Sequence, residues 1–209
     1  MASNANTNAW NETAFVTITA AAGSDVEFCS LTESIDIDSG ERPIETFPVL
    51  CGGRIFRLNP EGETTVSLKA YPTEAGTDTG TTGAGFYDLF FDSVTTATGL
   101  VSADNTLGTR KKFRVAILWT NSTSATSAVG VLGSPANAGM RWVGRNGYLT
   151  KVTPSFAAGE TLSYDVTFVF PARQKTQTTA NIKVESIDGV GTATLTALTS
   201  YTAVETSGF

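Results

Sequence analysis

The chain has 209 residues, of which 41% are apolar and only 16% are charged, and its formal net charge is −6. This apolar content excludes a disordered protein, and the length suits one domain with a sizeable core. The acidic balance argues against a conventional nucleic-acid-binding protein, because such proteins use cationic side chains to displace counterions from phosphates. Sparse charge is expected of a chain that buries its sides against identical copies, although Thr-rich secreted β proteins share it.

The chain contains no histidine. That absence removes the commonest general base, the commonest metal ligand and every catalytic triad that depends on imidazole. Paired carboxylates, such as Asp36 with Asp38 and Asp88 with Asp92, are the remaining candidates for acid–base chemistry, but such pairs arise by chance on any polar face. We therefore expect a protein that is not an enzyme and has no catalytic, cofactor-binding or metal-binding residues.

The two cysteines bear on metal binding and redox state, and the N-terminal residues bear on where the chain is made. Cys29 and Cys51 form no metal-binding spacing. Both adjoin strand-like segments, so we expect buried reduced thiols, with a disulfide as the alternative that only geometry decides. Residues 1–13 form a polar arm without the basic and apolar runs of a secretory signal, and no stretch approaches the roughly 18 apolar residues of a membrane helix. We expect synthesis in the cytoplasm and no membrane span.

In chain order, a first strand is expected at residues 14–20 (AFVTITA), which are rich in β-branched side chains. A second strand is expected at residues 31–38, where alternate positions separate by polarity. Leu31, Ile35 and Ile37 fall on one face, which predicts that this face is buried. The other face is polar and acidic and carries Thr32, Ser34, Asp36 and Asp38.

Residues 43–48 begin and end with proline, and neither proline can donate a backbone hydrogen bond. We therefore expect this segment to run along a surface and not to form a regular ladder throughout. Gly52 and Gly53 predict a bend that leads into a short strand at residues 54–58. A turn and another half-buried strand are expected at residues 59–62 and 63–71.

Two segments rich in small residues, 72–85 and 122–139, are expected to be long loops. Between them, residues 86–93 (FYDLFFDS) place apolar side chains at helical spacing, with aspartates on another face. This spacing predicts one short helix that covers the sheet, with a strand as the alternative.

The strongest strand pattern lies in residues 113–119, which are apolar on both faces at their centre and therefore predict an interior strand. Basic residues gather at its start, namely Arg110, Lys111, Lys112 and Arg114. Such a cluster can touch phosphate, form a solvated strand end or pair with acidic residues of a neighbouring subunit. We favour the last two, because neither interleaved aromatic residues nor a phosphate-binding glycine loop accompanies the cluster.

Two hairpins complete the pattern. Residues 140–143 and then 148–154 are expected to begin a hairpin that returns through residues 162–170, where five large apolar side chains alternate with Ser163, Asp165, Thr167 and Val169. Asp188 and Gly189 predict the turn of a closing hairpin that returns through residues 195–201. Because the period-two pattern recurs and the helical one occurs once, we expect a mostly β barrel or sandwich in a single domain spanning residues 1–209.

Residues 29–72 carry a resemblance to a known family. They contain, in order, the acidic alternating strand, GERPIE, CGGRIFR, NPEGET and VSLKAYP. This order resembles the major tail tube proteins of tailed viruses that infect bacteria or archaea, and the similarity extends through most of the chain. It implies a tail-tube-like β-sandwich or barrel of two roughly orthogonal antiparallel sheets, with one short flanking helix and long loops.

The resemblance also implies a function. Such subunits form rings, usually hexameric, that stack into the tube of a virion tail, with other tail proteins at the tube ends. Viral DNA passes through the lumen without specific binding, so carboxylates and hydroxyls that repel phosphate suit a lumen wall. Loops 72–85 and 122–139 are then available to reach neighbouring subunits or rings. Thr32, Ser34, Asp36 and Asp38 are the lumen candidates, with an ordinary solvated outer face as the alternative.

A second hypothesis stays open. An immunoglobulin-like β-sandwich that decorates a virion or mediates adhesion would share the strands, the Thr content and the absence of catalytic groups. Self-assembly distinguishes the two, because a decoration module should stay a small soluble species whereas a tube protein should form rings or filaments.

Overall fold

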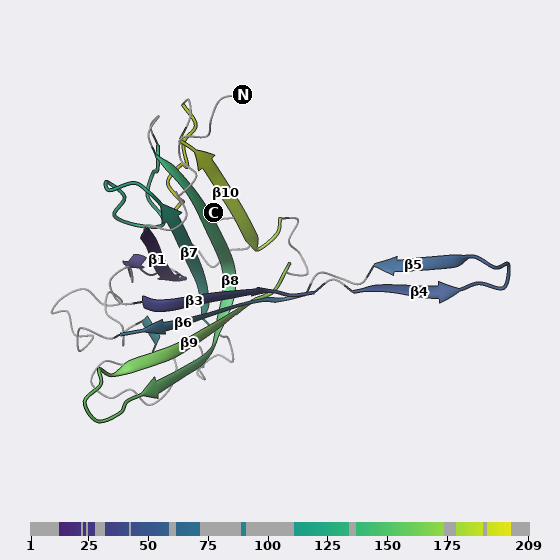
Figure 1. The fold of residues 1–209 in the computed structure, drawn as a ribbon, viewed down its shortest axis with the longest axis horizontal. Coiled ribbons are helices and arrows are strands. Elements are labelled where there is room, and N and C mark those ends of the chain that lie inside the picture. Colours follow the sequence, from purple (N-terminus) through teal and green to yellow (C-terminus); the bar gives the residue numbers. More distant parts are fainter. Residues whose placement is uncertain are drawn as a thin grey trace.

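The computed structural model describes residues 13–21, 23, 25–27, 32–41, 43–58, 62–71, 89–90, 111–133, 137–173, 179–189 and 192–201 (Figure 1). The strands are β1 (Thr13–Ala20), β2 (Asp25–Glu27), β3 (Thr32–Ser39), β4 (Ile44–Pro48), β5 (Arg54–Leu58), β6 (Thr64–Ala70), β7 (Lys112–Thr120), β8 (Ala138–Ser155), β9 (Ser163–Phe170) and β10 (Ile182–Asp188). Residues 1–12, Cys29, the expected loop 72–85 and Arg110 lie outside this described part.

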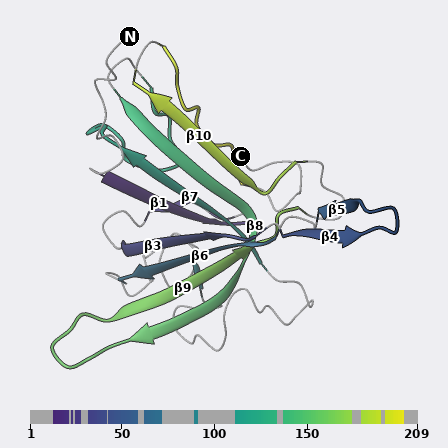
Figure 2. The same cartoon turned by 45° about the vertical axis from the view of Figure 1, so that its right-hand side comes forward.

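Eight of the described strands form one antiparallel sheet in the order β2-β1-β7-β8-β9-β6-β3, with β10 also paired to β8. The mostly β, antiparallel, tail-tube-like fold that the sequence predicts is therefore confirmed. The two groups of strands that we expected as separate sheets are continuous through β8, and Figures 1 and 2 show them running across one another. The remaining two strands, β4 and β5, form a separate hairpin.

The strand β8 joins the two groups because it is long and bends. Its first half pairs with β7 and β10, and its second half pairs with β9, so that Tyr148 is opposite both Lys112 and Val169. A register shift between Leu149 and Lys151 and the left-handed backbone of Asn146 (φ 55°) lie in the region of the bend. Both features turn the strand locally and let its two halves follow different directions.

The main core lies between the two groups of strands. It contains Val16, Ile18 and Ala20 of β1, Val66, Leu68 and Ala70 of β6, Phe113, Val115 and Ile117 of β7, and Tyr164, Val166, Phe168 and Phe170 of β9. Leu89 and Phe90, the described residues of the expected helix 86–93, are helical and fully buried in this core. Each of these strands contributes every second residue to the core, so that one of its faces is buried there. This period-two alternation is why the sequence pattern located these strands.

A second core covers the opposite face of β1, β7 and β8. Leu118 and Val143 pack there against Leu132 and Leu195. The last two come from segments 121–133 and 192–201, which pair with each other at Leu132 and Leu195. Because both of its faces are covered, β7 is the interior strand that its sequence predicts.

Three sequence expectations were wrong. Residues 44–48 form the ladder strand β4, which is possible because Pro43 precedes the strand and Pro48 is its last residue. The segment after Gly189 does not return along β10 in the described residues, because Leu195 pairs with Leu132 and this segment covers the second core. Cys51, expected to be buried, is a free and exposed thiol, because the hairpin that carries it leaves the body of the protein.

Candidate assembly surfaces

The predicted alternation of β3 is confirmed for its described side chains. Ser34, Asp36 and Asp38 are exposed, whereas Ile35 and Ile37 are half-buried and pack against the main core. Thr32 pairs with Ala70, but its side chain lies outside the described part. The placement of these polar residues on a lumen wall stays a prediction, because the structure contains a single subunit.

The polar side of β3 continues across three more strands. Asp36 is opposite Ser67, Ser67 is opposite Thr167, and Thr167 is opposite Lys151. Residues directly opposite one another in antiparallel strands point to the same side, so these rows form one surface. We call it the polar face, and it consists of Ser34, Asp36, Asp38, Thr65, Ser67, Lys69, Lys151, Thr153, Asp165 and Thr167.

The polar face is rich in hydroxyls and weakly acidic. The hydroxyls of Ser67 and Thr167 are 3.3 Å apart, and the amine of Lys69 lies 2.8 Å from the carboxylate of Glu33 beside the face. Hydrogen bonds from Lys69 and Tyr71 lower the pKa of Glu33, so this carboxylate is ionised at neutral pH. Four carboxylates, counting Glu33, and two amines give the surface a net charge of 4 − 2 = 2 negative charges. It can therefore repel phosphate while offering hydroxyls to water.

The hairpin of β4 and β5 extends away from the body (Figure 1), and we call residues 44–58 the β-arm. It exposes large apolar side chains on both of its faces. Ile44 and Phe56 are 60% and 68% exposed, and Phe47 and Ile55, which lie directly opposite one another, are 47% and 58% exposed. The side chain of Leu50 at the tip is fully exposed. No other described strand pairs with this hairpin, and a two-stranded hairpin by itself is at best marginally stable in water. This arrangement therefore indicates a surface that is completed by another molecule.

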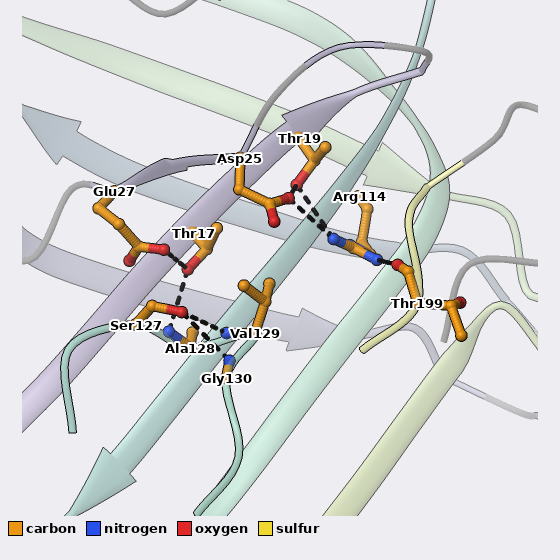
Figure 3. A network of polar contacts seen from close by, with 10 residues as sticks. All are labelled: Thr17, Thr19, Asp25, Glu27, Arg114, Ser127, Ala128, Val129, Gly130 and Thr199. Atoms are coloured by element: carbon orange, nitrogen blue, oxygen red, sulfur yellow. Dashed lines mark hydrogen bonds and ion pairs between the residues drawn. The ribbon is translucent and has the colours of Figure 1, made fainter. Parts of the chain in front are cut away.

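The basic cluster at the start of β7 is divided by burial. Lys111 and Lys112 are half-buried, whereas Arg114 is 1% exposed. Its guanidinium lies 2.9 Å from the carboxylate of Asp25 on β2 and donates to the backbone carbonyl of Thr199 at 2.6 Å (Figure 3). Burial lowers the pKa of Arg114, and the charge of Asp25 opposes this effect. Arg114 thus holds its own chain together, and pairing between subunits stays a prediction for the other three basic residues.

A second part of the same network fixes the loop that follows β7. The hydroxyl of Thr17 donates to the carboxylate of Glu27 at 2.6 Å and accepts the backbone N–H of Ala128 at 3.1 Å (Figure 3). The hydroxyl of Ser127 accepts the N–H groups of Val129 and Gly130, each at 3.1 Å. Burial raises the pKa of Glu27 despite the hydrogen bonds that favour its ionised form. Strand β2 and the described part of loop 122–139 are therefore held to the sheet by polar contacts.

The sequence interpretation missed this network and the related pair of Arg141 and Glu185. Arg141 is fully buried on β8, and its guanidinium lies 2.6 Å from the carboxylate of Glu185 on β10. It also donates to the carbonyls of Gly130 and Thr196. The available signal was an arginine at an interior position of an apolar strand, because a buried guanidinium needs a carboxylate or carbonyl partner.

No family model and no curated protein sequence matches the chain. Among solved structures, it is similar to a chain of the anti-feeding prophage baseplate, with 11% identity over 86% of this chain and 96% of that chain and a TM-score of 0.50. A chain of the PVC sheath–tube complex of an extracellular contractile injection system, in the extended state, has 14% identity over 82% of this chain and 88% of that chain, with a TM-score of 0.49. A chain of the tube-terminating cap of the anti-feeding prophage has 14% identity over 82% of this chain and 88% of that chain, with a TM-score of 0.46.

The likeness is one of fold. Of these three chains, the baseplate chain has a TM-score of 0.50, and at an identity of 11% a shared fold carries no function with it. The chain therefore shares the fold of a chain of that baseplate assembly. In the described residues, no helix is long and apolar enough to cross a membrane, and no group of three or more His, Cys, Asp or Glu side chains is placed to hold a metal ion.

Proposed function

We propose that this chain is the structural subunit of a viral tail tube. Residues 1–209 form one tail-tube domain, copies of which assemble into rings, hexameric in the simplest case, that stack into a hollow tube. The tube belongs to the tail of a virion, meets other tail proteins at its ends and conducts genomic DNA during ejection. The subunit performs no catalysis.

The observation that carries this proposal is the exposed β-arm on a tail-tube-like fold. Among its described side chains, the large exposed apolar ones are Ile44, Phe47, Leu50, Ile55 and Phe56. Full burial of a side chain of this size is worth about 1.5–3 kcal/mol, so leaving several in water is costly unless another molecule covers them. Because the arm is apolar on both faces, it suits insertion among neighbouring copies better than contact along one side.

The sheet edges also support assembly. Strands β2 and β3 end the path of the sheet, and β10 pairs only with β8 among the described strands. Unpaired edges of this kind are aggregation hazards in a monomer, but in a ring each edge can pair with a neighbouring subunit, and rotation closes the set.

The polar face supports the proposed lumen. Its hydroxyls and net negative charge offer phosphate no counterion release, so DNA would slide past without being held. In this arrangement the polar face lines the tube, and Ser34, Asp36 and Asp38 of β3 lie on its wall.

Negative-stain electron microscopy with light scattering, across a concentration series of the purified protein, tests the proposal. We expect rings or hollow tubes of uniform width. A matched variant carries Ile55→Ser and Phe56→Ser in the β-arm, which leaves the body untouched, and we expect it to stay a folded small species. A wild-type chain that stays monomeric at every concentration would overturn self-assembly and favour the decoration module.

A further inference from the structure

The β-arm and the turn between β8 and β9 lie at opposite ends of the same strands. The arm leaves the sheet between Ser39 and Thr64, and Thr64 is opposite Phe170, the last residue of β9. The turn of residues 156–162 adjoins the first residue of β9, Ser163. Eight residues of strand separate the two ends, or about 26 Å at roughly 3.3 Å per residue. Figures 1 and 2 both show the arm and the turn pointing in opposite directions.

The turn of residues 156–162 presents an apolar tip with a carboxylate. Phe156 is 70% exposed, and Ala157, Ala158 and Glu160 are exposed as well. The turn is tight, because the N–H of Glu160 donates to the carbonyl of Ala157 at 3.0 Å and Gly159 adopts a φ of 89°. A tight turn that holds an aromatic ring in water offers a contact surface to another molecule.

The β-arm has the complementary chemistry. Its residues 44–58 contain two arginines and one glutamate, a net charge of 2 − 1 = +1, while the whole chain carries −6, so the remainder carries −7. Glu45 lies opposite Arg57 across the arm, whereas Arg54 lies opposite Pro48. Arg54 is therefore the guanidinium that faces no carboxylate on the neighbouring strand of the arm, and it lies next to the exposed Ile55 and Phe56.

We propose that the β-arm of one copy docks on the 156–162 turn of another copy, with its apolar residues against Phe156 and with Arg54 paired to Glu160. The contact is heterologous, because different surfaces of the two copies meet, and such a contact gives a ring if rotation closes it and an open assembly if it does not. Because the arm and the turn point in opposite directions, repetition of this contact extends the assembly along that direction. It stacks one ring on the next. This inference rests on the proposed self-assembly and names the surface that receives the arm.

Cys51 at the tip of the arm provides a natural cross-linking handle. In a Cys29→Ser background, we would introduce Ala157→Cys or Ala158→Cys at the turn and treat the assembled particles with an oxidant or a short bismaleimide. Each chain then carries one thiol at each end, so we expect a covalent ladder of dimers, trimers and longer chains on a non-reducing gel. The control, Ser186→Cys on the exposed side of β10, should give no ladder, and Cys51→Ser in the Ala157→Cys protein should abolish it.

Charge exchange tests the proposed ion pair separately. Glu160→Lys or Arg54→Glu alone should raise the concentration at which tubes form by about tenfold, since like charges then meet at the contact. The double variant should restore assembly to within roughly threefold of the wild type, which a merely structural role of either residue would not produce.

The outcomes separate this inference from the proposed function. Tubes that form a ladder only with a thiol at the turn, together with rescue by the double exchange, establish the docking. Tubes that form normally but give no ladder with either turn cysteine, or exchanged charges without rescue, overturn the docking and leave the tube function intact. A protein that never assembles overturns both.

Discussion

Replacing Gly147 with alanine tests how closely the ring of Phe170 packs against β8 near its bend. A Cβ atom added at Gly147 would lie 2.3 Å from Cε1 and 2.5 Å from Cδ1 of Phe170. Phe170 is fully buried, and its ring packs against Trp142 and Phe168 at centroid distances of 5.6 Å and 6.3 Å, which hold it in place. Overpacking of this kind costs about 1–3 kcal/mol, and we expect the free energy of unfolding to fall by that amount.

Urea unfolding followed by tryptophan fluorescence measures this change. Gly130→Ala is the matched control, because its Cβ meets only ordinary contacts with Ser127 at 3.7 Å and beyond, and it should stay within about 0.5 kcal/mol of the wild type. Adding Phe170→Leu to Gly147→Ala removes the clashing ring atoms, so the double variant should be more stable than the sum of the single effects by about 1 kcal/mol. A Gly147→Ala protein as stable as the wild type, or strict additivity, would refute the close packing of Phe170 against Gly147.

Other side chains make further predictions. Burial raises the pKa of Glu27, so the stability that its carboxyl group contributes is present below the ordinary value of 4.5 and is lost as the pH rises through the folded pKa. Glutamine mimics the uncharged carboxyl group at every pH. Relative to the wild type, Glu27→Gln should therefore raise the free energy of unfolding more at pH 7 than at pH 4, measured by urea unfolding at both pH values. Glu185→Ala leaves the fully buried Arg141 without its carboxylate and should cost about 3–5 kcal/mol in the same assay. Asp36→Lys with Asp38→Lys should leave tubes intact but impair DNA ejection from virions, and unchanged infectivity would contradict the lumen assignment.

The strands around the main core could be predicted because each has one buried, apolar face and one more polar face. In β3, β6 and β9, the large apolar side chains recur at every second residue, and the structure buries that set against the other strand group. The two covered faces of β7 were visible as a continuous apolar run for the same reason. The period of the pattern is a direct consequence of burial in these strands.

The β-arm could not be placed from the sequence because its apolar residues resemble core residues. Phe47 and Ile55 have the composition of a buried strand, yet they are exposed in the single subunit. A pattern reports that a side chain needs to be covered, but it does not say whether the cover belongs to the same chain. The expectation of a buried Cys51 was wrong for this reason.

The polar network on the second core was hidden by distance along the chain. Arg114 and its partner Asp25 are 89 residues apart, and β2, which carries Asp25, has only three residues and no readable alternation. In the sequence, Arg114 appeared to belong with the lysines beside it. Only the pairing of β1 with both β2 and β7 brings its guanidinium to the carboxylate.

Electron cryomicroscopy of the purified assembly, at a resolution that traces β3, β6 and β9, tests the central claim most directly. We expect a hollow tube of stacked rings in which the polar face, with Asp36 and Asp38, lines the inner wall and each β-arm is buried among neighbouring copies. A tube with the polar face on its outer wall would contradict the lumen assignment. A solid filament, or particles no larger than one chain, would contradict the tube itself.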